Sequence, residues 1–240
     1  MDVRLSEVEL DVLWESACLG ELPLVLDVPS PGATHAERTE VVRRTWAGLA
    51  ERRVPTAAVQ ERLRALAMGR RALELRAWLD GEVRALLSSE GDADVLAVLA
   101  HGGCTLRSLP SADPVGRMVA VLPEAPAGRG VSVSVRVASF EAAGRSARGT
   151  DIAEALIRDG LPSADARVLV SMCEGITRRG QFCATWRTSQ GRRERAPRVV
   201  GFHDNDSGRY LTLRRGDHLT VAPADSAVLA REVSGLFSGT

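Results

Sequence analysis

Three residues late in the sequence have side chains that could perform nucleophilic chemistry. Cys183 could supply the nucleophile, His203 a base, and Asp204 a group that orients the histidine. This chemistry requires the thiol and the base to lie within hydrogen-bond reach, which order along the chain does not establish. A buried thiol next to a surface turn accounts for the same residues. A cysteine hydrolase centred on Cys183 is therefore an alternative hypothesis, which unchanged thiol reactivity and activity in Cys183→Ser would remove.

Two further motifs resemble parts of known sites but are incomplete. The stretch from Asp204 to Gly208 reads Asp-Asn-Asp-Ser-Gly, similar to a calcium loop, yet it lacks the third acid and the late glutamate of that motif. The run from His101 to Gly103 is similar to the oxyanion-loop glycines of esterases, which also need a G-x-S-x-G elbow that this sequence lacks. We expect a turn at each place, and we predict no catalytic residue, no cofactor and no metal.

An arginine-rich stretch is the main local concentration of charge. Arg192 and Arg193 stand close to Arg187, Arg195 and Arg198. A nucleic-acid-binding or regulatory module using this loop is one hypothesis, which predicts salt-dependent retention of DNA or RNA. Such a site normally needs a broader basic face or stacking aromatic residues, and aromatic residues are only 4% of the chain. A solvated hairpin tip or a docking patch for an acidic partner therefore explains the stretch better.

The composition is that of an ordinary globular protein. The chain has 240 residues, of which 45% are hydrophobic and 26% charged, and its formal net charge is zero. A chain without net charge has no overall electrostatic attraction for nucleic acid or an anionic membrane. No apolar run is long enough to span a bilayer. Neither a signal pattern nor a C-x-x-C pair is present, which indicates reduced thiols and a cytoplasmic location.

Start signals predict three helices and one strand in the first part of the chain. Ser6 followed by Glu9, and Thr34 followed by Glu37, have the spacing of capping boxes. A third helix is expected after Pro55. The run Leu22–Val28 predicts a strand, because it is apolar and is closed by two prolines.

After the third predicted helix, the spacing of apolar residues changes from about every fourth residue to every second residue. Alternation from Leu73 onward predicts a four-stranded antiparallel meander with turns at Asp80-Gly81, Gly91-Asp92 and Gly102-Gly103. The Asp80-Gly81 dipeptide favours a type I′ turn, since both central residues of that turn need positive φ. Asp113-Pro114 is then expected to begin a helix.

The order strand, glycine turn, strand, proline and helix occurs twice. Placing Pro110 on Pro223 also places Gly103 on Gly216 and Leu106 on Leu219. We therefore predict an α+β fold made from a pseudo-twofold duplicated unit, with a central antiparallel β-sheet flanked by two helical bundles. The expected halves are residues 1–122 and 131–240, joined by a linker over residues 123–130, and both belong to one domain.

Three stretches of the sequence together resemble the EspG family of type VII (ESX) secretion-associated proteins of actinobacteria. They run from Glu9 to Glu37-Arg38, from Val200 to Leu211, and from Leu219 to Asp225. The resemblance implies a non-enzymatic cytoplasmic chaperone. Its implied partner is a secreted PE–PPE-like pair or another helical-hairpin ESX substrate. The chaperone would bind the hydrophobic tip of this substrate, keep the substrate soluble and direct it to the secretion machinery. It further implies no stable membrane insertion, and we expect a monomer or weak homodimer.

The residues of the partner surface are predicted from strand face and position, not from a family motif. The resemblance implies a long loop between the second and third strands that contributes to binding in mycobacterial members. The matching connection here is only Asp80-Gly81, so the expected surface moves to the neighbouring sheet and the C-terminal half. An exposed tryptophan on a sheet is a plausible anchor for a protein contact. The predicted set is Arg76, Trp78, Asp80, Glu82, Met172, Phe182, Trp186, Arg192 and Arg193.

Overall fold

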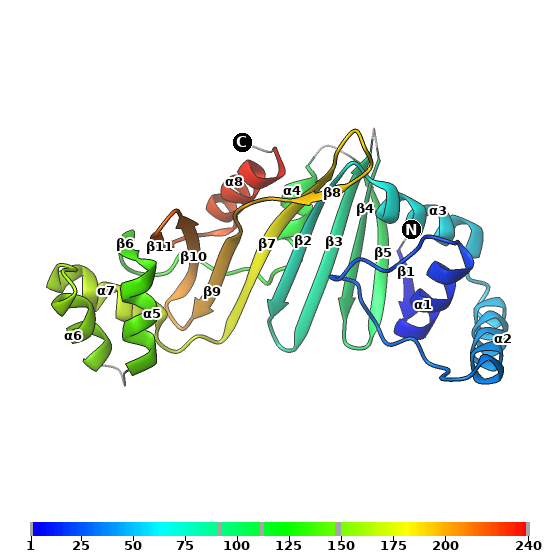
Figure 1. Ribbon diagram of the computed structural model, residues 1–240, viewed down its shortest axis with the longest axis horizontal. Helices are drawn as coiled ribbons and strands as arrows, with labels where there is room; N and C mark the ends of the chain where they lie inside the picture. Colours follow the sequence, from blue (N-terminus) through cyan, green and yellow to red (C-terminus); the bar gives the residue numbers. More distant parts are fainter. Residues whose placement is uncertain (1, 91–92, 111–112, 147–149, 239–240) are drawn as a thin grey trace. The chain divides into compact units, whose positions relative to one another are not determined.

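The computed structural model describes residues 2–90, 93–110, 113–146 and 150–238 (Figure 1). The chain forms two compact units. The first contains residues 1–76, 81–118 and 184–195, and the second contains residues 77–80, 119–183 and 196–240. The first unit thus takes a segment from the predicted second half, and the second unit takes residues 77–80 from the predicted first half.

The first unit is built on an antiparallel sheet with the strand order β1-β5-β4-β3-β2. The end of β7 and the short strand β8 also belong to this unit. Its elements, in chain order, are β1 Val3–Ser6, α1 Glu7–Ser16, α2 His35–Glu51, α3 Thr56–Met68, β2 Arg71–Trp78, β3 Glu82–Glu90, β4 Ala93–Ala100, β5 Gly103–Pro110, α4 Pro114–Val119, the last part of β7 Arg178–Arg187, and β8 Arg193–Arg195.

The predicted helix starts are confirmed. Ser6 Oγ accepts the Glu9 N–H while the Glu9 carboxylate accepts the Ser6 N–H, and the Thr34 and Glu37 pair repeats this capping box at α2. Asp113 accepts the Gly116 N–H at 2.8 Å at the start of α4. These side chains satisfy backbone donors that have no partner within the first helical turn.

Replacing Ser6 with alanine is expected to lower the free energy of unfolding by about 1 kcal/mol, since the Glu9 N–H loses its acceptor. Urea denaturation measures this change. Ser171→Ala is the control, because that hydroxyl stands at an exposed helix position and donates to the Val168 carbonyl, so its loss should cost under about 0.5 kcal/mol. Equal effects in the two variants would contradict the assigned capping role.

The core of the first unit lies between α1, α3 and one face of the sheet. It includes Leu10 and Leu13 of α1, Leu63 and Leu66 of α3, and Leu106 of β5, all fully buried. Apolar residues three and four apart on the helices therefore meet alternate residues of the strands, as the two periods of the sequence predicted.

The predicted meander is confirmed, but its tight turn lies elsewhere. His101 and Gly102 both have positive φ, of 51° and 70°, and Ala100 pairs with Gly103, so this is the connection with type I′ character. Gly81 has a φ of 138°, whereas Asp80 has no positive φ, so the type I′ prediction for Asp80-Gly81 is wrong. The turn predicted at Gly91-Asp92 lies outside the described residues.

The strand predicted over Leu22–Val28 is wrong. This segment is irregular, with a turn in which the Leu26 N–H donates to the Pro23 carbonyl at 2.7 Å. Arginine side chains of the sheet bind its backbone instead of a neighbouring strand: Arg76 donates to the Leu24 carbonyl and Arg84 to the Asp27 carbonyl, both at 2.6 Å. The strand that precedes the helices is β1, which pairs with β5.

The second unit repeats the order of strand, helices, antiparallel strands and helix. Its strand order is β7-β9-β10-β11-β6, and its core includes Leu156, Leu169, Tyr210 and Val221. Its elements are β6 Val133–Arg136, α5 Val137–Ser146, α6 Thr150–Arg158, α7 Ser163–Cys173, the first part of β7, β9 Val200–Asn205, β10 Gly208–Arg215, β11 His218–Pro223 and α8 Ser226–Phe237.

The predicted α+β class with antiparallel sheet structure is confirmed. In each unit the first strand pairs with the last strand of the meander, β1 with β5 and β6 with β11. Val3 and Leu5 pair with Leu106 and Cys104 in the first unit. The corresponding ladder of the second unit joins Val133 and Val135 to Val221 and Leu219, so position for position Leu219 corresponds to Cys104 and not to Leu106. The origin of this arrangement by duplication stays a prediction.

The predicted linker, residues 123–130, is held against strand β10. The guanidinium of Arg209 donates to the Pro123 carbonyl at 2.8 Å, and its backbone N–H donates to the Pro126 carbonyl at 2.8 Å. The Gly128 N–H returns a bond to the Arg209 carbonyl. A Cβ on Gly128 would lie 2.1 Å from the Tyr210 ring, so this close approach requires glycine.

Candidate functional site

The structure gives two of the three nucleophilic candidates other partners. His203 Nε2 lies 2.9 Å from the Met172 carbonyl oxygen, and its ring stacks on Tyr210. The Asp204 carboxylate accepts two bonds from Arg209, at 2.7 and 2.9 Å. The histidine therefore positions a helix end and the carboxylate neutralises a buried guanidinium, which are structural tasks. Cys183 itself is buried.

Two other thiols are unsuited to nucleophilic chemistry. Burial raises the pKa of Cys104 to about 12 and that of Cys173 to about 11. The thiolate is the reactive form, and an apolar environment disfavours it.

The stretch from Asp204 to Gly208 is a turn and not an ion loop. The Ser207 N–H donates to Asn205 Oδ1 at 2.8 Å, Gly208 has a φ of 126°, and Asn205 pairs with Gly208 across the hairpin. The prediction of an Asx-type turn is confirmed. Within the described ranges, no group of three or more His, Cys, Asp or Glu side chains could hold a metal ion.

Stability is expected to fall as the pH is lowered from about 7 to about 5, in part through His203. Burial lowers the pKa of this imidazole below its ordinary 6.5, although its contact with the Met172 carbonyl and the charge of Asp204 oppose the shift. The unfolded chain thus binds a proton that the folded chain resists, which favours unfolding below about pH 6.5. Urea denaturation across this range, with His203→Gln as the matched variant, measures the contribution. An identical pH slope in both proteins would contradict it.

Trp78 is the clearest exposed anchor among the predicted partner-binding residues. It closes β2 and its side chain is 57% exposed, which is unusual for the largest apolar side chain. Two residues on, Asp80 forms an ion pair with Arg178 at 3.6 Å. Ile176, which is 42% exposed, stands two residues before that arginine. The second unit therefore presents two apolar side chains near one exposed ion pair.

Arg76 and Glu82 lie on the first unit and are already engaged. Arg76 binds the Leu24 carbonyl, as described above, and Glu82 lies 3.7 Å from Arg84. Both side chains are exposed, so they remain candidates for contact with a partner.

Met172 and Phe182 are placed in the interior, which corrects their prediction as surface residues. Both side chains have 0% exposure. Met172 packs in the core of the second unit, and Phe182 starts a run of four consecutive buried residues in β7. The alternation of the strand stops there because both faces of the sheet are covered. Neither side chain can touch a partner in this conformation.

Trp186, Arg192 and Arg193 lie together on the β7–β8 hairpin. Trp186 Nε1 donates to Glu194 at 3.3 Å, and Arg193 reaches both Thr185 Oγ1 and the Ala67 carbonyl at 3.4 Å. Arg192 is exposed at the turn. Burial and the neighbouring Arg187 lower the pKa of Arg193, which the charge of Glu74 opposes. The predicted hairpin tip is thus confirmed, with one arginine directed outward and one half-buried.

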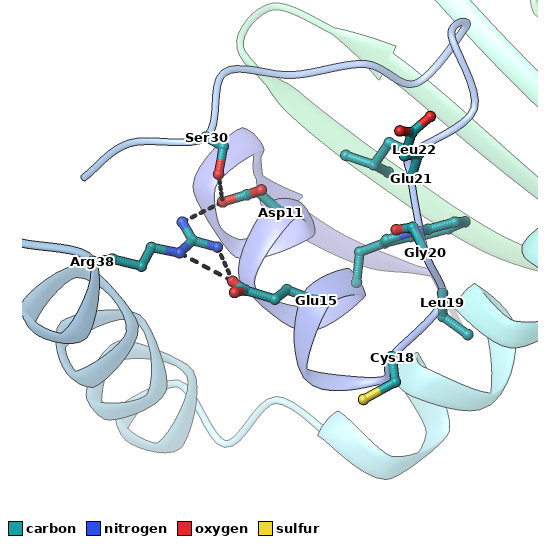
Figure 2. Close-up of a pocket in the computed structure, with 10 residues that line it drawn as sticks. Asp11, Glu15, Cys18, Leu19, Gly20, Glu21, Leu22, Ser30 and Arg38 are labelled. Atoms are coloured by element: carbon teal, nitrogen blue, oxygen red, sulfur yellow. Dashed lines mark hydrogen bonds and ion pairs between the residues drawn. The ribbon is translucent and has the colours of Figure 1, made fainter. Parts of the chain in front are cut away.

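The sequence did not reveal a cavity of about 380 Å³ in the first unit, between α1 and the segment that follows it (Figure 2). Arg38 of α2 binds both Asp11 and Glu15 on one wall, and Ser30 donates to Asp11 at 3.2 Å. The remaining lining consists of Trp14, Cys18, Leu19, Gly20, Glu21 and Leu22. Because Arg38 already neutralises Asp11 and Glu15, the cavity combines apolar side chains with a paired charge cluster.

Leu24, on the same segment as the cavity, was also missed as a surface residue. It is 78% exposed, although its carbonyl is fixed by Arg76. The flanking Pro23 and Pro29 were the available signal, because proline has no N–H to donate to a sheet ladder.

Comparison with known proteins identifies relatives along nearly the whole chain. The sequence model of the EspG family matches residues 6–235. The structure is similar to that of the Mycobacterium tuberculosis type VII secretion system chaperone EspG5, which was solved in complex with a PE25-PPE41 dimer. The TM-score is 0.75 at 16% sequence identity, over 98% of this chain and 95% of that chain. At this identity the likeness establishes the shared fold. No curated protein matches the sequence.

Proposed function

We propose that this chain is a chaperone of a type VII secretion system. The premise is that the chain belongs to the EspG family, whose sequence model matches residues 6–235. The chain binds the hydrophobic tip of a helical PPE-like secretion substrate in the cytoplasm, keeps that substrate soluble, and delivers it to the secretion machinery. The observation that supports this most strongly is the full-length fold similarity to EspG5, a chaperone solved with a PE25-PPE41 dimer.

The contact surface proposed here centres on Trp78. An exposed tryptophan offers a large, rigid contact area, and such residues often dominate binding energies. Ile176 adds apolar area, while the Asp80–Arg178 pair supplies polar groups that would orient a partner. Arg76 and Glu82, which belong to the first unit, are proposed separately as polar contacts of that unit. An apolar centre with charged groups at its edge suits the end of a helical hairpin, which would otherwise associate with itself.

The remaining properties follow from the same proposal. A chaperone must meet its substrate before export, which places it in the cytoplasm. None of the helices in the described ranges has the length and apolar character needed to span a bilayer. The free chain is proposed to be a monomer or weak homodimer, and light scattering during size-exclusion chromatography measures this directly.

Co-expression with candidate substrates tests the proposal. The chain and a PE–PPE pair, or another helical-hairpin substrate from the same genome, are expected to co-elute as a soluble complex. The same substrate without the chain is expected to aggregate. Failure to form a complex with every such substrate would contradict the proposed function, whereas a complex with only one pair would support it and name the substrate.

A further inference from the structure

The proposed substrate surface leaves one strongly charged feature of the first unit without a role. Five arginines, here called the arginine cluster, gather where the β7–β8 hairpin meets the start of β2: Arg70, Arg71, Arg187, Arg192 and Arg193. The backbone brings them together, since the Arg187 N–H donates to the Arg70 carbonyl at 2.8 Å.

The hairpin that carries three of these arginines is ordered by its own hydrogen bonds. The Thr188 N–H donates to the Arg192 carbonyl at 2.8 Å, and the Gly191 N–H donates to the Thr188 carbonyl at 2.9 Å. Gly191 has a φ of 77°, which favours glycine at this position. The backbone that carries these three arginines is therefore ordered and is not a loose loop.

The two inner arginines anchor the hairpin to the end of α3. The side chains of Arg187 and Arg193 both donate to the Ala67 carbonyl, at 2.5 and 3.4 Å. The last turn of α3 has no basic residue of its own, so these guanidinium groups meet the negative end of the helix dipole. Their further acceptors, the Gly191 carbonyl for Arg187 and Thr185 Oγ1 for Arg193, are also neutral, so these bonds leave the positive charge of both groups uncompensated.

Few negative groups balance the cluster. Arg70, Arg71 and Arg192 are exposed, and within the part of the chain that the structure describes none of them forms an ion pair with a carboxylate. Arg187 Nε is buried and finds no hydrogen-bond acceptor. Of the nearby acids, Glu74 acts on Arg193 and Glu194 accepts from Trp186. Concentrated like charge disfavours the folded state, whereas a bound anion would relieve the repulsion.

We propose that the arginine cluster is a docking site for an acidic segment of a protein partner. Guanidinium groups form paired hydrogen bonds with carboxylates, and several of them fixed together suit a short stretch rich in Asp and Glu. The cluster shares no residue with the substrate surface proposed above, so this site goes beyond that surface and does not depend on it.

A protein segment fits the cluster better than a nucleic acid does. Single strands normally stack successive bases on several aromatic side chains, but Phe182 is buried and Trp186 is the one aromatic residue of the described β7–β8 hairpin that could serve. The chain as a whole has no net positive charge to attract a polyanion.

Fluorescence anisotropy with the full chain tests the site. The probe is a labelled peptide that alternates Glu or Asp with Gly and Ser, and it is expected to bind more weakly as the salt concentration rises. The double variant Arg71→Glu with Arg192→Glu is expected to weaken binding about tenfold or more, since attraction becomes repulsion at two exposed positions. Arg71→Lys with Arg192→Lys keeps the charge and should retain most of the affinity.

Arg167→Glu with Arg231→Glu is the matched control, because it makes the same change in net charge at two exposed arginines of the second unit. This control should leave the affinity within about twofold of the unaltered chain. Three results would overturn the proposal: no peptide binding at low salt, an equal loss in the control, or tighter binding of an oligouridine of equal charge. No secretion substrate enters this experiment, so its result is independent of the proposed function.

Discussion

Replacing Arg209 with methionine is expected to lower the free energy of unfolding by about 3–5 kcal/mol, the range for breaking a buried ion pair from one side. Arg209 has 0% exposure and holds Asp204 through two short hydrogen bonds. Without it, a carboxylate that is 4% exposed would lose its counter-charge. The Pro123 carbonyl would also lose its donor, and the guanidinium would leave the Phe202 ring, 5.4 Å away. Urea denaturation measures the change.

A double variant separates the ion pair from the packing of the side chain. Asp204→Leu combined with Arg209→Met removes both charges, and we expect it to be more stable than Arg209→Met alone because no unpaired charge stays buried. The exposed pair Arg43 and Glu40 is the comparison, since solvent screens such a pair and its loss should destabilise the chain far less. A loss below about 1 kcal/mol in Arg209→Met would contradict the structural role assigned here.

Replacing Trp78 with alanine is expected to weaken substrate binding about 30-fold or more, which corresponds to about 2 kcal/mol. The change removes the most exposed aromatic side chain of the proposed surface, while a residue that is 57% exposed contributes little to the core. The unfolding free energy should therefore change little. Calorimetry with the PE–PPE pair that gives a soluble complex measures the affinity.

Met68→Ala is the control for this experiment. Met68 has a similar exposure of 55%, but it ends α3 and is not among the residues proposed to bind the substrate, so its loss should leave the affinity nearly unchanged. Equal affinities of Trp78→Ala and the unaltered chain would place the substrate elsewhere, and the cavity of Figure 2 would become the next surface to examine.

Local signals in the sequence correctly predicted the helices that begin at a capping residue. The Ser6 and Thr34 capping boxes and the Asp113 cap lie where their spacing placed them, because these contacts span only three residues. The period-two runs likewise became the antiparallel strands of both units. Short-range hydrogen bonds and side-chain periodicity thus carry most of the information about where elements begin.

The same local signals failed where contacts with distant parts of the chain determine the secondary structure of a segment. Leu22–Val28 has an apolar composition typical of a strand, but Arg76 and Arg84 bind its carbonyls and it has no ladder partner. Such long-range contacts leave no local pattern, although Pro23 reduced the capacity of the segment to pair.

Burial on both sides of a strand also has no local signal. Phe182 was placed on the surface from its strand face and position, whereas Phe182, Cys183, Ala184 and Thr185 are consecutive in β7 and all buried. The prediction of Phe182 as a surface residue failed for this reason. By contrast, the exposure of Trp78 agreed with its place on the strand, since its neighbours Ala77 and Leu79 face inward.

The docking of residues 184–195 onto α3 has a consequence during synthesis. The donors that Arg187 and Arg193 supply to the Ala67 carbonyl leave the ribosome more than a hundred residues after that helix. At roughly 5–20 residues per second, the first unit waits several seconds for its final segment. Its helices and meander must persist in that interval as an incomplete intermediate. Completion of the N-terminal unit is therefore timed by the translation of the C-terminal part of the chain.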